Sequence, residues 1–181
     1  MMKSDIKEIL SRKTSKVLIE DITKLVITSP ELFDDLYILT TDEDITISWH
    51  ALWACCKISE THPSFFYTKY EELANRAMNE KNASTLRLIL NILNHLPTPA
   101  SINVAFFDFC IQNMISPNNT SACQALLMKI AYKTCHNNHT ELLMEIKTIL
   151  ENMDETYYNP AAISAKNTIL RKLGKSNRIK S

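Results

Sequence analysis

Apolar residues recur along this chain at the spacing of helices. Between residues 142 and 153, for example, they lie mostly three or four positions apart and so share one face of a helix. No stretch alternates apolar and polar residues over a useful length, and no Asn-Gly or Asp-Gly hairpin turn occurs. The pattern predicts an all-α protein with essentially no sheet.

Polar and proline-containing breaks divide this pattern into separate helices. Ser29-Pro30 and Asn159-Pro160 are typical helix starts, because the first residue can cap and proline suits the first turn. Gly174 follows the last apolar position and is expected to close the final helix. The predicted helices cover residues 4–10, 15–28, 30–39, 46–61, 66–77, 86–96, 102–115, 120–136, 142–153 and 160–173.

The predicted helices form pairs that repeat. The second members begin near Trp49, Leu86, Ala122 and Ala162, at intervals of about 36–41 residues. Such a period indicates a helical solenoid, in which each unit buries its apolar face against its neighbours. We expect one repeat domain over residues 1–174, followed by a basic, disordered tail over residues 175–181.

One repeat junction resembles a known family. In the segment from Asp42 to Ala54, acidic turn residues precede an apolar residue and then an alanine on the second helix, which is similar to a HEAT repeat. Residues 82–93 are similar but weaker, with Arg87 near the family's basic position. Ser48 stands where the first unit would carry an arginine, and the later units lack the turn Asp, so the likeness is to a degenerate HEAT-like or armadillo-like repeat. The resemblance implies a right-handed α-α superhelix of about four helix pairs whose concave face binds a macromolecule.

Composition is typical of an ordered globular domain, with 45% apolar and 22% charged residues. No signal peptide and no membrane-spanning run is expected, since charged or amide side chains interrupt every apolar stretch. The five cysteines are odd in number and lie within helical patterns, which favours reduced, buried thiols in a cytoplasmic protein.

Charge is balanced overall, at 20 basic and 20 acidic residues, but unevenly distributed. Between Leu25 and Cys56 there is no Lys or Arg, whereas from Lys166 onward there is no acid. Solvated faces and a disordered tail explain this; head-to-tail stacking of copies is the alternative. The early acidic residues are Glu31, Asp34, Asp35, Asp42, Glu43 and Asp44, and the late basic residues are Lys166, Arg171, Lys172, Lys175, Arg178 and Lys180.

Few side chains suggest chemistry. Cys135-His136-x-x-His139 falls short of the four ligands of a closed zinc site, so we expect no metal. Of the adjacent Cys55 and Cys56, one is expected in the core and the other accessible, because neighbouring helical side chains diverge. The carboxylates near residue 42 lack the glycine of a calcium loop and are expected to form a solvated turn.

Trp49 and Trp53 lie one helical turn apart, where a stacking platform for nucleic-acid bases is conceivable. Some HEAT-like proteins are DNA glycosylases, so a DNA-binding or glycosylase-like solenoid is the alternative function. The surrounding segment is acidic, however, and phosphate contacts dominate nucleic-acid affinity. We therefore expect at least one of these tryptophans in the core.

Enzymatic activity has little support in the sequence. With no glycine before Gly174, the phosphate-binding loops of Walker and dinucleotide sites are excluded, and the glycine-rich signature of helical lyases is missing. Ser–His or Cys–His pairs that meet only in the fold stay open. The predicted function is a non-catalytic scaffold without cofactor that binds a protein through its concave face or a helix end. The candidate partner-binding residues are Asp42, Glu43, Asp44, Arg87, Arg171, Lys172 and Lys175.

Overall fold

The computed structural model describes residues 3–12, 15–136 and 139–179, and over these residues it is helical with no strand, which confirms the all-α prediction. Short 3-10 segments (η) join several of the α-helices. The elements are α1 Lys3–Leu10, α2 Lys16–Thr28, η1 Pro30–Leu32, α3 Phe33–Ile38, η2 Leu39–Thr41, α4 Ile45–Thr61, η3 Pro63–Lys69, α5 Tyr70–Asn79, α6 Ala83–His95, α7 Val104–Met114, α8 Ser121–Cys135, α9 Thr140–Glu151, η4 Glu155–Tyr157 and α10 Pro160–Ile179.

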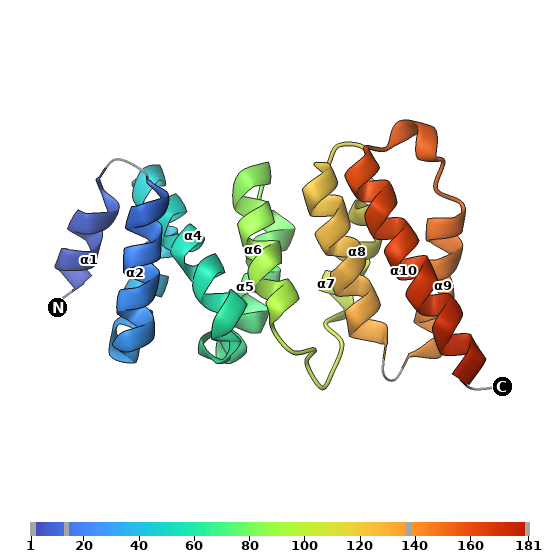
Figure 1. The fold of residues 1–181 in the computed structure, drawn as a ribbon, viewed down its shortest axis with the longest axis horizontal. Helices are drawn as coiled ribbons and strands as arrows, with labels where there is room; N and C mark the ends of the chain where they lie inside the picture. The colour runs from blue at the N-terminus through green and yellow to red at the C-terminus, as the bar shows by residue number, and fades with distance from the viewer. Residues whose placement is uncertain (1–2, 13–14, 137–138, 180–181) are drawn as a thin grey trace. The chain divides into compact units, whose positions relative to one another are not determined.

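The chain divides into two compact units. The first comprises Met1–Leu73 with Asn91–Leu96, and the second comprises Ala74–Leu90 with Pro97–Ser181. In the first unit, α4 packs against α2 and η2. In the second, α8 packs against both α7 and α10 (Figure 1).

A capping side chain opens the second helix of each pair. Asp44 Oδ1 accepts hydrogen bonds from the amides of residues 46 and 47, and Asn82 Oδ1 accepts from those of residues 84 and 85. Thr120 caps α8 through the amide of residue 123, and Asn159 caps α10 through that of residue 161. These caps stand at positions 44, 82, 120 and 159, so successive caps lie 38, 38 and 39 residues apart. The repeat is therefore regular in structure, although only the first unit caps with an aspartate.

Val17, Ile22, Leu25 and Val26 fall at helical spacing and predict one buried stripe for the helix over residues 15–28, but this prediction is partly wrong. Ile22 and Val26 are buried as expected, whereas Val17 is 64% exposed and Ile19 takes its place in the core. The helix begins one position after Ser15, whose hydroxyl caps it, and it packs against α4. At the next helix start, Ser29 provides no side-chain cap, contrary to expectation.

The last helix does not end at Gly174. Helix α10 continues to Ile179, and Gly174 has no positive φ, so the prediction that it closes the helix is wrong. A left-handed residue is needed only where a helix stops, and here it continues. The division into a repeat domain over 1–174 and a disordered tail over 175–181 stays a prediction.

Candidate functional site

The acidic turn Asp42-Glu43-Asp44 is built by local hydrogen bonds. The amide of Asp42 donates to the Leu39 carbonyl as η2 ends, and Asp42 Oδ1 accepts from the Asp44 amide at 3.0 Å. Asp44 in turn caps α4. These bonds fix the backbone of the turn, and Glu43 and Asp44 remain exposed.

A second contact comes from α1. Ile6 and Leu10 are fully buried in the first unit, and the Leu10 carbonyl oxygen lies 2.7 Å from Nδ1 of the buried His50 on α4. Because a carbonyl oxygen only accepts, Nδ1 carries the proton in this bond. Helix α1 is thus held against α4, with Lys7 facing the acidic turn.

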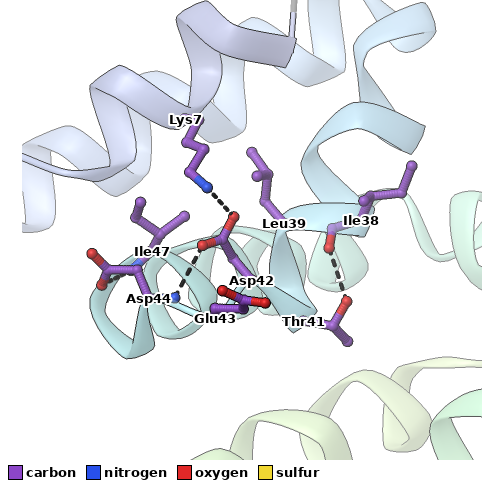
Figure 2. Close-up of a pocket in the computed structure, with 8 residues that line it drawn as sticks. All are labelled: Lys7, Ile38, Leu39, Thr41, Asp42, Glu43, Asp44 and Ile47. Atoms are coloured by element: carbon purple, nitrogen blue, oxygen red, sulfur yellow. Dashed lines mark hydrogen bonds and ion pairs between the residues drawn. The ribbon is translucent and has the colours of Figure 1, made fainter.

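Lys7 and Asp42 form a close ion pair. Lys7 Nζ donates to Asp42 Oδ2 at 2.6 Å (Figure 2), and the side chains are 48% and 12% exposed. The hydrogen bond to Asp42 raises the pKa of Lys7, and the charges of Asp42, Asp44 and Glu43 add to this effect against the opposing effect of desolvation. One carboxylate of the turn is therefore neutralised by this pair.

A pocket of about 490 Å³ opens beside this turn. In Figure 2, dashed lines join Asp42 to the Lys7 ammonium and to the Asp44 amide. A third dashed line joins the Thr41 hydroxyl to the Ile38 carbonyl. Two isoleucines next to the turn are unusually exposed, Ile38 at 52% and Ile45 at 83%. The site combines carboxylates with exposed apolar side chains. The pocket lining is Lys7, Ile38, Leu39, Thr41, Asp42, Glu43, Asp44 and Ile47.

The basic candidates lie in the second unit. Arg171 and Lys172 are exposed on α10, and Lys172 Nζ lies 5.5 Å from the centre of the Tyr132 ring. Arg87 is exposed on α6. The side chain of Lys175 lies outside the described residues. The structure thus gathers Asp42, Glu43 and Asp44 in one turn of the first unit and places the basic candidates in the second.

Lys166 is not part of a basic surface. It is 6% exposed, and its Nζ donates to the Met153 carbonyl at 3.1 Å and to Glu155 Oε1 at 2.9 Å. Its position at the head of the basic sequence segment suggested a solvated charge. In the structure it instead ties α10 to the segment that leads into η4.

Two predictions about side chains of α4 are wrong. Cys55 and Cys56 are both buried, at 0% and 5% exposure, so neither is an accessible thiol. Trp49 and Trp53 are both half-buried, so neither belongs fully to the core. Their ring centroids lie 5.1 Å apart at a tilt of 54°, in contact with each other.

Cys135 and His136, the candidates for a metal site, make packing and hydrogen-bond contacts within the fold. Cys135 is fully buried, and burial raises its pKa to about 12, while His136 Nδ1 lies 2.9 Å from the Tyr132 hydroxyl. Asn137 and Asn138 lie outside the described residues. Within the part of the chain that the structure describes, no three His, Cys, Asp or Glu side chains gather as metal ligands.

One serine–histidine contact does form in the fold, between Ser59 and His95 at 2.9 Å. The Ser59 hydroxyl donates its single proton to the Cys56 carbonyl at 2.7 Å, and Ser59 is fully buried. A nucleophile needs a base that accepts its proton and a route for substrate. Ser59 lacks both in this arrangement.

Sequence reasoning missed Lys7, Ile38 and Ile45. Lys7 stands 35 residues before its partner, so no local spacing reveals the pair. Ile45 follows the Asp44 cap directly, which places it in the first helical turn. Its exposure could not be predicted from helical spacing, because Ile45 lies four and seven residues before Trp49 and Leu52 and so falls on the same face of the helix.

The repeat of capped helix pairs accords with a comparison to known families. The HEAT repeat domain family matches residues 6–173. The chain belongs to this family. No curated protein and no solved structure matches it. The α-solenoid class is confirmed, and among the described residues no helix is both long and apolar enough to cross a membrane.

Proposed function

We propose that this HEAT repeat protein is a non-catalytic scaffold that binds a protein partner at the start of α4. HEAT repeats are commonly protein-interaction scaffolds. The observation that carries the proposal is the exposed surface around the acidic turn, where Glu43 and Asp44 lie beside the exposed Ile38 and Ile45. We call these four residues the acidic surface.

This surface has the two properties that recognition requires. Its carboxylates give charge selectivity and speed encounter with a basic partner. Its isoleucines offer apolar area that a partner removes from water on binding. Lys7 neutralises only Asp42, so the charges of Glu43 and Asp44 remain available.

The function is tested by affinity capture with the purified chain in matched variants. Glu43→Lys reverses one charge without removing the Asp44 cap or the Lys7–Asp42 pair, and Glu31→Lys makes the same change before α3 as a control. We expect wild type and Glu31→Lys to retain the same protein and Glu43→Lys to lose it, at unchanged melting temperature. No retained protein, together with several degrees of stabilisation by a metabolite, would favour a ligand-binding or enzymatic role instead.

DNA binding is the competing outcome of the same experiment. If DNA were the partner, retention at low ionic strength would fall steeply as salt increases, because phosphate contacts release counterions. We propose no such contact at the acidic surface, since its carboxylates repel phosphate. Arg87, Arg171 and Lys172 are the residues whose replacement would weaken DNA retention.

A further inference from the structure

The least buried side of α4 carries both tryptophans of the chain. Within residues 47–59 the side chains that are not buried are Ser48, Trp49, Trp53 and Lys57, and the last three recur at four-residue intervals. Residues four positions apart lie one above the other on the same side of a helix. This side of α4 is therefore aromatic, whereas the solvent-facing side of a helix is usually polar. We call Trp49 and Trp53 the tryptophan pair.

The indole groups of the tryptophan pair are available to a partner. Their ring centroids lie 5.1 Å apart, so the rings contact each other and a partner must use their outer surfaces. Within the part of the chain that the structure describes, neither indole N–H donates a hydrogen bond, and neither is fully buried. A buried indole N–H normally has a partner. These two donors are therefore left for water or for the carbonyl oxygens of a bound peptide.

The charges around the tryptophan pair favour a basic ligand. No Lys or Arg lies between Leu25 and Cys56. The next cation, Lys57, is held by both carboxylate oxygens of Glu60, at 2.8 and 3.1 Å. The acidic surface lies at the start of the same helix. An ammonium or guanidinium group attracted by this charge can stack on an indole, which is the aromatic ring that binds cations best.

The spacing of the tryptophan pair matches an extended peptide. Four residues of helix rise by about 6 Å, and alternate side chains of an extended chain lie on one side at intervals of about 6.6 Å. We infer that the tryptophan pair binds an extended segment of the partner whose alternate arginine or lysine side chains each stack on one indole. This inference rests on the proposed function, because Ile45 of the acidic surface lies one turn before Trp49 on the same face.

Intrinsic fluorescence tests the inference directly, because the tryptophan pair holds every tryptophan of the chain. The probe is a blocked hexapeptide in which arginine and serine alternate, added to the full chain at low salt. The control peptide carries citrulline in place of arginine, which keeps the planar group and removes the charge. We expect a saturable change in tryptophan emission with the arginine peptide and binding of the citrulline peptide that is weaker by about tenfold or more.

Matched variants locate the binding. Trp53→Leu should weaken binding of the arginine peptide by about fivefold or more, and Trp53→Phe, which keeps an aromatic ring, should weaken it less. Trp49 reports binding in both variants. Tyr67 is 52% exposed on η3 of the same unit, so Tyr67→Leu is the control and should leave binding unchanged. The comparison of the two peptides uses the wild-type chain and decides the question even where the leucine variant of Trp53 fails to fold.

Emission that neither peptide changes, or that both change equally, would overturn the inference. Oligothymidylate that acts at lower concentrations than the arginine peptide would also overturn it, since the tryptophan pair would then stack nucleic-acid bases. Failure here is distinguishable from failure of the proposed function. A chain that captures a protein through Glu43 but does not bind the arginine peptide loses only this inference. A chain that captures no protein and binds neither peptide loses both.

Discussion

The Lys7 ammonium lies 2.6 Å from the Asp42 carboxylate and joins α1 to the turn before α4 across 35 residues of sequence. The pair leaves Glu43 and Asp44 as the exposed charges of the acidic surface. It also makes Lys7 the local determinant of how negative that surface is. The contribution of the Lys7–Asp42 pair to the stability of the fold is expected to depend on pH.

For Lys7→Gln, we expect a small loss of stability that vanishes at high pH. The folded state raises the pKa of Lys7 above its usual 10.5, so the pair stabilises the fold below pH 10.5 and stops doing so as the pH passes the raised value. Urea unfolding of wild type and variant from pH 7 to 11.5 measures this. If the difference in unfolding free energy between wild type and variant widened with pH, the stabilising role of the Lys7–Asp42 pair would be contradicted.

The caps are expected to contribute through hydrogen bonds rather than charge. Asn82→Ala removes the acceptor for two amides and should cost about 1 kcal/mol, or about 2–4 °C in melting temperature. Asn82→Asp keeps the acceptor and should stay close to wild type. The same comparison at Asp44 separates cap from charge, because Asp44→Asn keeps the first and loses the second. Equal losses for the Ala and Asp variants at position 82 would rule out a capping role.

The buried thiols should make the protein sensitive to alkali. Burial raises the pKa of Cys135 from 9.0 to about 12 and also raises that of Cys110. The unfolded chain loses these protons above about pH 9, whereas the folded chain keeps them, so the unfolding free energy should fall between pH 9 and about 12. Cys135→Val should show a shallower decline than wild type in urea unfolding. If the unfolding free energy of Cys135→Val declined with pH as steeply as that of wild type, Cys135 would not be the source of the alkaline sensitivity.

The buried Lys166 should contribute mainly through its bond to the Met153 carbonyl and its packed stem. Lys166→Ala leaves that carbonyl without its donor and is expected to cost about 1–3 kcal/mol. Glu155 is half exposed, so Glu155→Gln should cost less than about 1 kcal/mol. Chemical denaturation of both variants measures the difference. A larger loss for Glu155→Gln would mean that the ion pair dominates.

Much of this fold is readable from the sequence. Helical spacing of apolar residues, together with prolines and caps, places most helices within a few residues of their observed bounds, because both signals are local. The regularity of the repeat was harder to see. The four capping residues differ in type, but each supplies a side-chain oxygen that accepts a hydrogen bond from a backbone amide. The sequence motif is therefore weak although every repeat keeps the capping function. The caps are Asp44, Asn82, Thr120 and Asn159.

The candidate site was only partly readable. The acidic turn is a contiguous run and stands out, whereas Lys7 reaches it through tertiary packing of α1. The burial of Cys56 and Lys166 likewise depends on which neighbours cover each helix, and single-helix periodicity carries no such information. Gly174 is a further example, because a residue suited to end a helix ends it only where the chain turns, and α10 continues past it.

Photo-crosslinking is the most direct test of the central claim that the acidic surface contacts a protein partner. A photoreactive residue placed at position 43 should yield a discrete protein adduct, whereas the same residue at position 31 should not. The adduct at position 43 should weaken when Asp44→Asn is added, with the melting temperature unchanged. Equal adducts at both positions, or none at position 43, would contradict the account.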